Sequence, residues 1–97
     1  MQLAWDTNKN RQIKEERGVS FEEIVERIHA GDVFDIVDHP NKIKYPHQKM
    51  FMVLLKGYVY CVPCVEMKEG YFLKTIIPSR KATKEYLSER IDDENQA

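Results

Sequence analysis

The sequence predicts an α+β domain with the element order β-α-α-β-β-β-β-α, in which helices pack on an antiparallel sheet. Two observations indicate this fold: an amphipathic helix follows a clear capping signal, and four β-rich segments between residues 33 and 77 are separated by turn residues. With 97 residues, one domain spanning 1–97 is expected.

The N-terminal part is expected to form a short strand over residues 1–5 and two helices. Asp6 or Thr7 can cap a helix over 7–17, which Gly18 ends. Ser20 and Glu23 make a capping box for the next helix, which ends at Gly31. Apolar residues recur on one face of this second helix: Phe21, Ile24, Val25 and Ile28.

The rest of the chain is expected to form the sheet and a last helix. A loop over 38–48 contains two prolines, and Gly57 and Gly70 mark turns. Pro78 should end the strand ladder, and the tail over 92–97 is acidic. The predicted strands are Val33–Val37, Met50–Leu55, Tyr58–Val65 and Tyr71–Ile77; a helix over 81–91 carries an inner stripe of Tyr86, Leu87 and Ile91.

The charges are unevenly distributed along a chain whose net charge is −1. No acid falls within 39–65 or within 71–84, and these two windows carry eight Lys and Arg residues. This pattern predicts a positive face that binds an anion; the alternative is that the lysines are scattered, solvated charges. No run approaches ~18 apolar residues and no signal peptide is recognised, so a cytoplasmic protein without a membrane span is expected.

The segment from Lys74 to Lys84 reads as a strand that runs into a helix. Backbone N–H groups at a helix N-terminus favour anions, and this junction adds a hydroxyl and several cations. The junction therefore predicts a phosphate site built from Lys74, Ser79, Arg80, Lys81 and Lys84.

Cys61 and Cys64 form a C-x-x-C pair, but within a β-rich run. Three residues apart on a strand, their side chains point to opposite faces, and no second pair is spaced to complete a zinc site. A redox or metal role is therefore not expected.

Two motifs at the ends of the chain bear a family resemblance. The N-terminal signature of BrnT-type toxins resembles Trp5-Asp6 with Asn8-Lys9-Asn10 and the run 18–23 of this sequence. Their C-terminal signature resembles Ile76-Ile77 followed by the run 79–83. The motifs bracket about 80 of the 97 residues, while the loop over 38–48 departs from the family pattern. The resemblance implies a RelE-like fold and a type II toxin that cleaves RNA and is neutralised by a small DNA-binding antitoxin of the ribbon-helix-helix kind.

Metal-independent RNA cleavage needs a base, an acid and cations that stabilise the phosphorane. Arg80 suits the last role because its fork holds phosphate oxygens bidentately, and it also matches the family motif. Histidine titrates near neutral pH, which makes His47 the candidate base or acid, and Lys74 is the third catalytic candidate. Lys81, Lys84, Ser79, Lys44 and Lys49 are expected to bind substrate, with no metal and no cofactor.

Two other functions stay open on the sequence. One is a non-catalytic module whose positive face binds a nucleic acid or an acidic partner. The other is a DNA-nicking toxin on the same fold, because a phosphate site does not identify the sugar.

Overall fold

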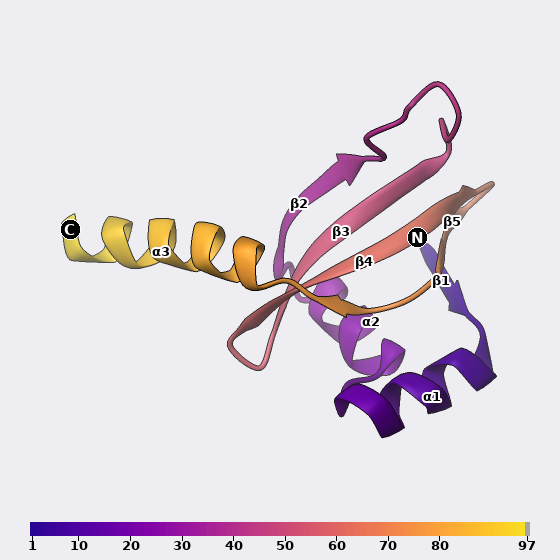
Figure 1. Cartoon of the computed structure of the whole chain (residues 1–97), viewed down its shortest axis with the longest axis horizontal. Helices are drawn as coiled ribbons and strands as arrows, with labels where there is room; N and C mark the ends of the chain where they lie inside the picture. The colour runs from indigo at the N-terminus through magenta and orange to yellow at the C-terminus, as the bar shows by residue number, and fades with distance from the viewer. Residues whose placement is uncertain (97) are drawn as a thin grey trace.

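The computed structural model describes residues 1–96, with side chains described for residues 1–88. Three helices and a six-stranded sheet form an α+β domain (Figure 1). The elements are β1 (Gln2–Trp5), α1 (Thr7–Arg17), α2 (Phe21–His29), β2 (Val33–Asp38), β3 (Gln48–Leu55), β4 (Tyr58–Met67), β5 (Gly70–Leu73), β6 (Ile77–Pro78) and α3 (Arg80–Gln96). No helix among the described residues is long and apolar enough to cross a membrane.

Local capping chemistry places the first two helices as the sequence predicts. Asp6 accepts a hydrogen bond from the Lys9 N–H, and Gly18 ends α1 in the left-handed conformation with φ 69°. Ser20 caps α2 by accepting from the Glu23 N–H at 3.2 Å.

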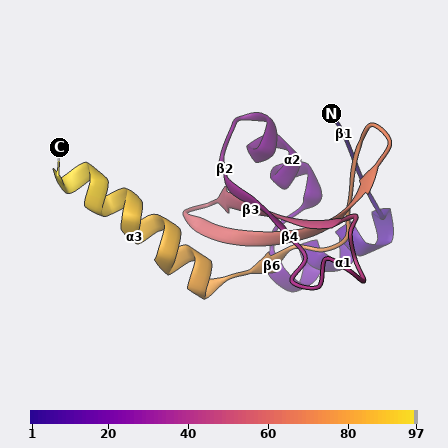
Figure 2. The same ribbon diagram turned by 90° about the horizontal axis from the view of Figure 1, so that it is seen from above.

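The hydrophobic core lies between α1, α2 and one face of the sheet. Trp5 stacks on Phe21 with ring centroids 5.8 Å apart, which fixes β1 against the start of α2. Figure 2 shows α2 lying over one side of the sheet. The buried apolar side chains of this core come from every layer: Ile13, Val19, Phe21, Ile24, Ile28, Phe51, Val53, Leu55, Val62, Cys64, Leu73 and Ile76.

The sheet has the order β1-β5-β4-β3-β2, and it is mixed rather than antiparallel. The prediction of an antiparallel sheet was wrong at β1, which pairs in parallel with β5. Gly70 makes this pairing possible, because a Cβ there would collide with the backbone of Gln2. The β3–β4 hairpin turns through Lys56 and Gly57, with φ of 54° and 74°, as a two-residue turn requires.

The predicted strand Tyr71–Ile77 is interrupted, because residues 74–76 leave the ladder between β5 and β6. Arg17 at the end of α1 donates a hydrogen bond to the Ile76 carbonyl in this gap. Pro78 is the last residue of β6, opposite Tyr60 of β4, so the ladder ends there as predicted. A proline is tolerated there because β6 pairs with β4 on one side only, so no strand on the other side needs a backbone N–H from residue 78.

Among its described side chains, α3 contacts the sheet near the start of the helix, and its backbone then runs away from the body, as both ribbon views show. Ala82 is buried, and Tyr86 stacks on Phe34 with centroids 5.2 Å apart. The helix continues to Gln96, so the predicted end at residue 91 was too early. The expected inner position of Ile91 lies outside the described side chains.

Candidate phosphate-binding site

The junction between β6 and α3 is fixed by Ser79 and Thr83. The Ser79 hydroxyl accepts from the Ala82 N–H at 3.1 Å, so it caps α3. The Ser79 N–H donates to the Val59 carbonyl at 3.0 Å, and the Thr83 hydroxyl accepts from the Val59 N–H at 2.8 Å. The start of α3 is thereby held at one end of β4. The sequence analysis gave Thr83 no role beyond the C-terminal motif, because its partner Val59 lies 24 residues away along the chain.

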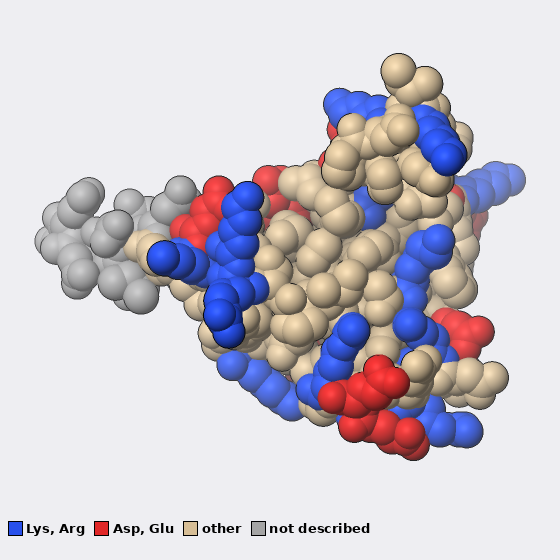
Figure 3. Space-filling view, in the orientation of Figure 1, with Lys and Arg blue, Asp and Glu red and all other residues tan. Residues whose placement is uncertain are grey.

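Three exposed cations lie at this junction: Arg80, Lys81 and Lys84. Lys74 is exposed too, but its N–H donates to the Pro63 carbonyl, four residues along β4 from Val59, or about 13 Å at ~3.3 Å per residue. None forms an ion pair with a side chain among residues 1–88. Figure 3 shows Lys and Arg side chains gathered over the first turns of α3, beside a broad uncharged area above the sheet. The N-terminal N–H groups of α3 add to this positive potential, so the junction is suited to an anion such as phosphate.

The lysines of the first acid-free window are arranged differently. Lys49 Nζ lies 2.6 Å from Asp38 and 3.4 Å from Glu66, and Lys42 lies 3.1 Å from Asp38. The hydrogen bond from Lys49, followed by that from Lys42, lowers the pKa of Asp38, and Asp38 in turn raises the pKa of Lys49. Lys56 pairs with Glu23 at 3.3 Å.

The expectation that window 39–65 forms an acid-free surface was therefore wrong. Acids that flank the window in sequence or come from α2 fold back onto its lysines, because antiparallel pairing brings Asp38 and Glu66 to the two sides of Lys49. Among the described side chains, most of the Lys and Arg residues of the two windows that have no ion pair thus lie at the start of α3.

His47 and Lys44 lie with this loop and not with Arg80. The His47 side chain is 74% exposed, and its Nδ1 is 3.7 Å from Glu66. Lys44 Nζ lies 5.3 Å from the centre of the neighbouring Tyr45 ring.

The distance between His47 and the start of α3 follows from the length of β4, because the two are bonded to different residues of this strand. His47 is bonded through its carbonyl to Glu66, whereas Ser79 is bonded to Val59. Seven residues of strand separate these two positions, or about 23 Å at ~3.3 Å per residue. The structure brings Ser79, Arg80, Lys81 and Lys84 to one region, and it does not bring His47, Lys44 and Lys49 to it. Lys74 was expected there too, but its N–H is bonded to the Pro63 carbonyl, which lies between the two positions on β4.

Arg17 is the further cation that sequence reasoning missed. It reaches the Ile76 carbonyl from α1, 59 residues away along the chain. A contact of this kind depends on how α1 packs against the 74–76 segment, which no local pattern encodes.

The two cysteines lie on opposite faces of β4, as predicted. Cys64 is buried in the core, and burial raises the pKa of its thiol to about 11. Cys61 Sγ lies 3.5 Å from Met50 Sδ on the other face, and burial raises the pKa of this thiol too. Within the described residues, no three His, Cys, Asp or Glu side chains are placed to hold a metal ion.

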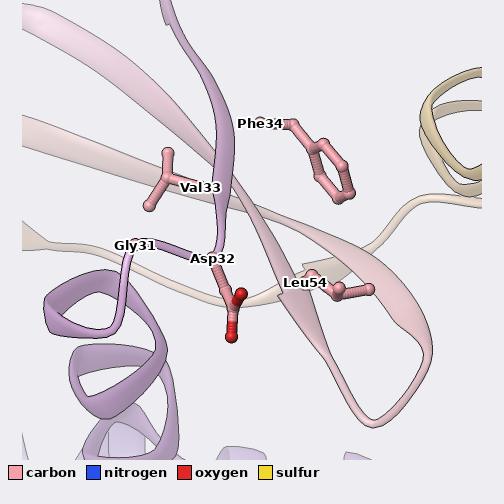
Figure 4. Close-up of a pocket in the computed structure, with 5 residues that line it drawn as sticks. All are labelled: Gly31, Asp32, Val33, Phe34 and Leu54. Atoms are coloured by element: carbon pink, nitrogen blue, oxygen red, sulfur yellow. The ribbon is translucent and has the colours of Figure 1, made fainter. Parts of the chain in front are cut away.

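A small cavity lies away from the cations, at the turn between α2 and β2. It has a volume of about 220 Å³ and is lined by Gly31, Asp32, Val33, Phe34 and Leu54 (Figure 4). The Asp32 carboxylate is already paired with Arg27 at 2.8 Å. The cavity therefore offers little polar chemistry to a ligand.

Comparison of the chain with protein-family models, with curated proteins and with solved structures finds no match.

Proposed function

We propose that this chain is the toxin of a type II toxin–antitoxin pair and acts as a metal-independent endoribonuclease in the cytoplasm. One observation carries the proposal: three exposed cations without ion pairs among the described side chains lie at the capped N-terminus of α3, while Lys42, Lys49 and Lys56 are paired with acids. The BrnT-like motifs at both ends of the sequence agree with it.

In the proposed reaction, the substrate 2′-hydroxyl gives its proton to a water molecule and its oxygen bonds to the adjacent phosphorus, the bond from phosphorus to the 5′-oxygen breaks, and a 2′,3′-cyclic phosphate remains. Arg80 holds the non-bridging oxygens and stabilises the charge that grows on them in the phosphorane. Lys81 or Lys84 protonates the leaving oxygen and the other binds a flanking phosphate, while Lys74, held at Pro63 on β4, binds a phosphate farther along the RNA. The separation of His47 from Arg80 argues against His47 as the base in this conformation.

The same separation favours a second function, a non-catalytic module that binds nucleic acid at the start of α3. Binding needs only the cations, whereas cleavage also needs a group that takes the 2′-hydroxyl proton. A DNA-nicking toxin would use the same phosphate contacts.

Induced expression of the chain in a bacterial host distinguishes these functions. The proposal predicts growth arrest with fragmented RNA and intact DNA, and co-expression of the small neighbouring antitoxin gene should restore growth. Arrest with nicked DNA and intact RNA would assign the DNA activity. Growth at the uninduced rate, with the protein present at high level, would favour the binding module.

A further inference from the structure

Three side chains that contain sulfur meet on the face of the sheet that α2 does not cover (Figure 2). Cys61 on β4 lies directly opposite Met52 on β3, and ladder partners of this kind share a face. Met50, two residues before Met52, points to the same face. Cys61 Sγ contacts Met50 Sδ at 3.5 Å, and all three side chains are half-buried. These three residues are called the sulfur cluster here.

The sulfur of Met52 is also within reach of Cys61. The Cβ atoms of residues opposite each other in an antiparallel ladder lie about 4.5–5.5 Å apart. A methionine side chain is unbranched and turns about three bonds, so its sulfur can lie above the residue across the ladder. The sulfur cluster therefore offers one thiol and two thioethers to a single ion.

The surroundings of the sulfur cluster offer few nitrogen or oxygen ligands. Ile77 of β6 lies opposite Cys61 on the other side from β3, and the carboxylate nearest in register is that of the exposed Asp35, opposite Met52. The three histidines of the chain lie outside the strands, at the end of α2 and in the loop before β3. Zinc needs four ligands, and calcium and magnesium need several oxygens. Thiolate and thioether sulfurs select Cu(I) instead.

We propose that the sulfur cluster binds one Cu(I) ion through the Cys61 thiolate and the Met50 and Met52 thioethers. On binding, the S–H bond of Cys61 breaks, its electron pair stays on sulfur and forms the bond to copper, and the proton passes to water. One thiolate and one Cu(I) ion leave the site without net charge, which suits a half-buried apolar surface. A divalent ion would leave a positive charge there without a partner.

The spacing of the C-x-x-C pair alone did not predict this site. A single ion held by Cys61 and Cys64 is disfavoured, because the two side chains lie on opposite faces of β4. The sulfur cluster uses one of these cysteines and takes its thioethers from β3, which the register of the hairpin brings beside it. It uses none of the cations at the start of α3, so the inference does not depend on the proposed function.

Transfer of copper from a coloured probe tests the site. Reduced protein is added, without oxygen, to Cu(I) held by excess bathocuproine disulfonate, and the loss of the probe's absorbance measures binding. One ion per chain is expected. Because burial raises the pKa of the Cys61 thiol, the metal-free protein holds this proton at neutral pH, and the apparent affinity should rise about tenfold per pH unit.

The NMR signals of methyl-labelled methionines locate the bound ion. The Met50 and Met52 signals should shift when Cu(I) is added. The signals of Met1 and Met67, which are exposed and lie outside the sulfur cluster, should stay in place.

Substitutions separate the ligands from the other sulfurs of the chain. Cys61→Ser removes the thiolate and should lower affinity at least ~100-fold, whereas Met50→Leu and Met52→Leu should each lower it about tenfold. Met67→Leu removes an exposed thioether and Cys64→Ala removes the other thiol, and both variants should bind like the unaltered protein. Circular dichroism checks that each variant is folded; if Cys64→Ala is not, Cys64→Val keeps more of the core volume and replaces it.

Failure of the protein to take Cu(I) from the probe at any excess would overturn the proposal. So would binding that survives Cys61→Ser, or methyl shifts that avoid Met50 and Met52. Equal losses of affinity in Cys61→Ser and in a folded Cys64 variant would also overturn it, since they would assign the ion to the C-x-x-C pair of an opened strand. Because the experiment needs no RNA, its answer does not depend on ribonuclease activity.

Discussion

The Thr83 hydroxyl accepts a hydrogen bond from the backbone N–H of Val59 at 2.8 Å, and this contact joins α3 to β4. Thr83→Val keeps the shape of the side chain but leaves the buried Val59 N–H without this partner. The free energy of unfolding should fall by ~1–3 kcal/mol, which urea denaturation measures. Thr75→Val is the control, because Thr75 is half-buried and its side chain makes no such bond; an equal loss there would show that the contact is unimportant.

Protonation of Asp38 should weaken the fold at acid pH. Its pKa is lowered in the folded protein by Lys49 and then Lys42, so the stabilisation is present above the unfolded pKa and is lost as pH falls through the folded value. Urea midpoints should therefore drop between about pH 5 and pH 2. In Asp38→Asn this drop should be smaller, whereas Asp35→Asn, which removes an exposed acid without an ion pair in the described residues, should keep it. If the urea midpoint falls equally with pH in all three proteins, Asp38 does not stabilise the fold through its ion pairs.

The cysteines should remain thiols with low reactivity. Burial raises both pKa values, and the two side chains point to opposite faces, so neither a thiolate nor a mutual disulfide is favoured. Iodoacetamide at neutral pH should modify Cys64 only after unfolding in urea, with Cys61 reacting slowly in the folded protein. Mass spectrometry counts the modifications. Rapid labelling of Cys64 in the native protein, or a Cys61–Cys64 disulfide formed in air, would show that the core side of β4 is accessible to solvent.

The two groups of cations should behave differently in RNA binding. Lys81→Gln and Lys84→Gln remove unpaired charges and should each lower RNA affinity and reduce the slope of log K against log salt by about 1. Lys49→Gln breaks ion pairs with Asp38 and Glu66, so it should lower stability and leave RNA affinity nearly unchanged. Fluorescence anisotropy of a labelled oligonucleotide at several salt concentrations measures both quantities. If Lys49→Gln loses more RNA affinity than Lys81→Gln or Lys84→Gln, the RNA binds at the loop over 38–48 and not at the start of α3.

Local signals explain what the sequence predicted well. Asp6, Gly18 and Ser20 act on their own neighbours, so the bounds of α1 and the start of α2 follow from a few residues. The same holds for the β3–β4 hairpin, which Gly57 allows. The cation cluster at the start of α3 was predicted because Arg80, Lys81 and Lys84 lie within five residues of one another in the chain.

Long-range pairing explains what the sequence could not supply. The parallel β1–β5 ladder joins residues about 68 positions apart, and it depends on the close approach at Gly70. The ion pairs of Lys49 depend on the register of three strands, so a window without acids in sequence gave no acid-free surface in space. The distance from His47 to Arg80 follows from the length of β4, which no motif encodes.

Cleavage of a defined RNA by the purified protein, with EDTA present, tests the central claim most directly. The unaltered protein should cut the RNA and leave the matching DNA intact. Arg80→Ala should lower the rate by ~10²–10³ with the fold unchanged by circular dichroism, and Arg80→Lys should also be slow because the bidentate fork is lost. Arg11→Ala, an exposed arginine on α1, should cut at the normal rate. Cleavage by Arg80→Ala at the rate of the unaltered protein, or no cleavage of any RNA by a folded protein, would contradict the account.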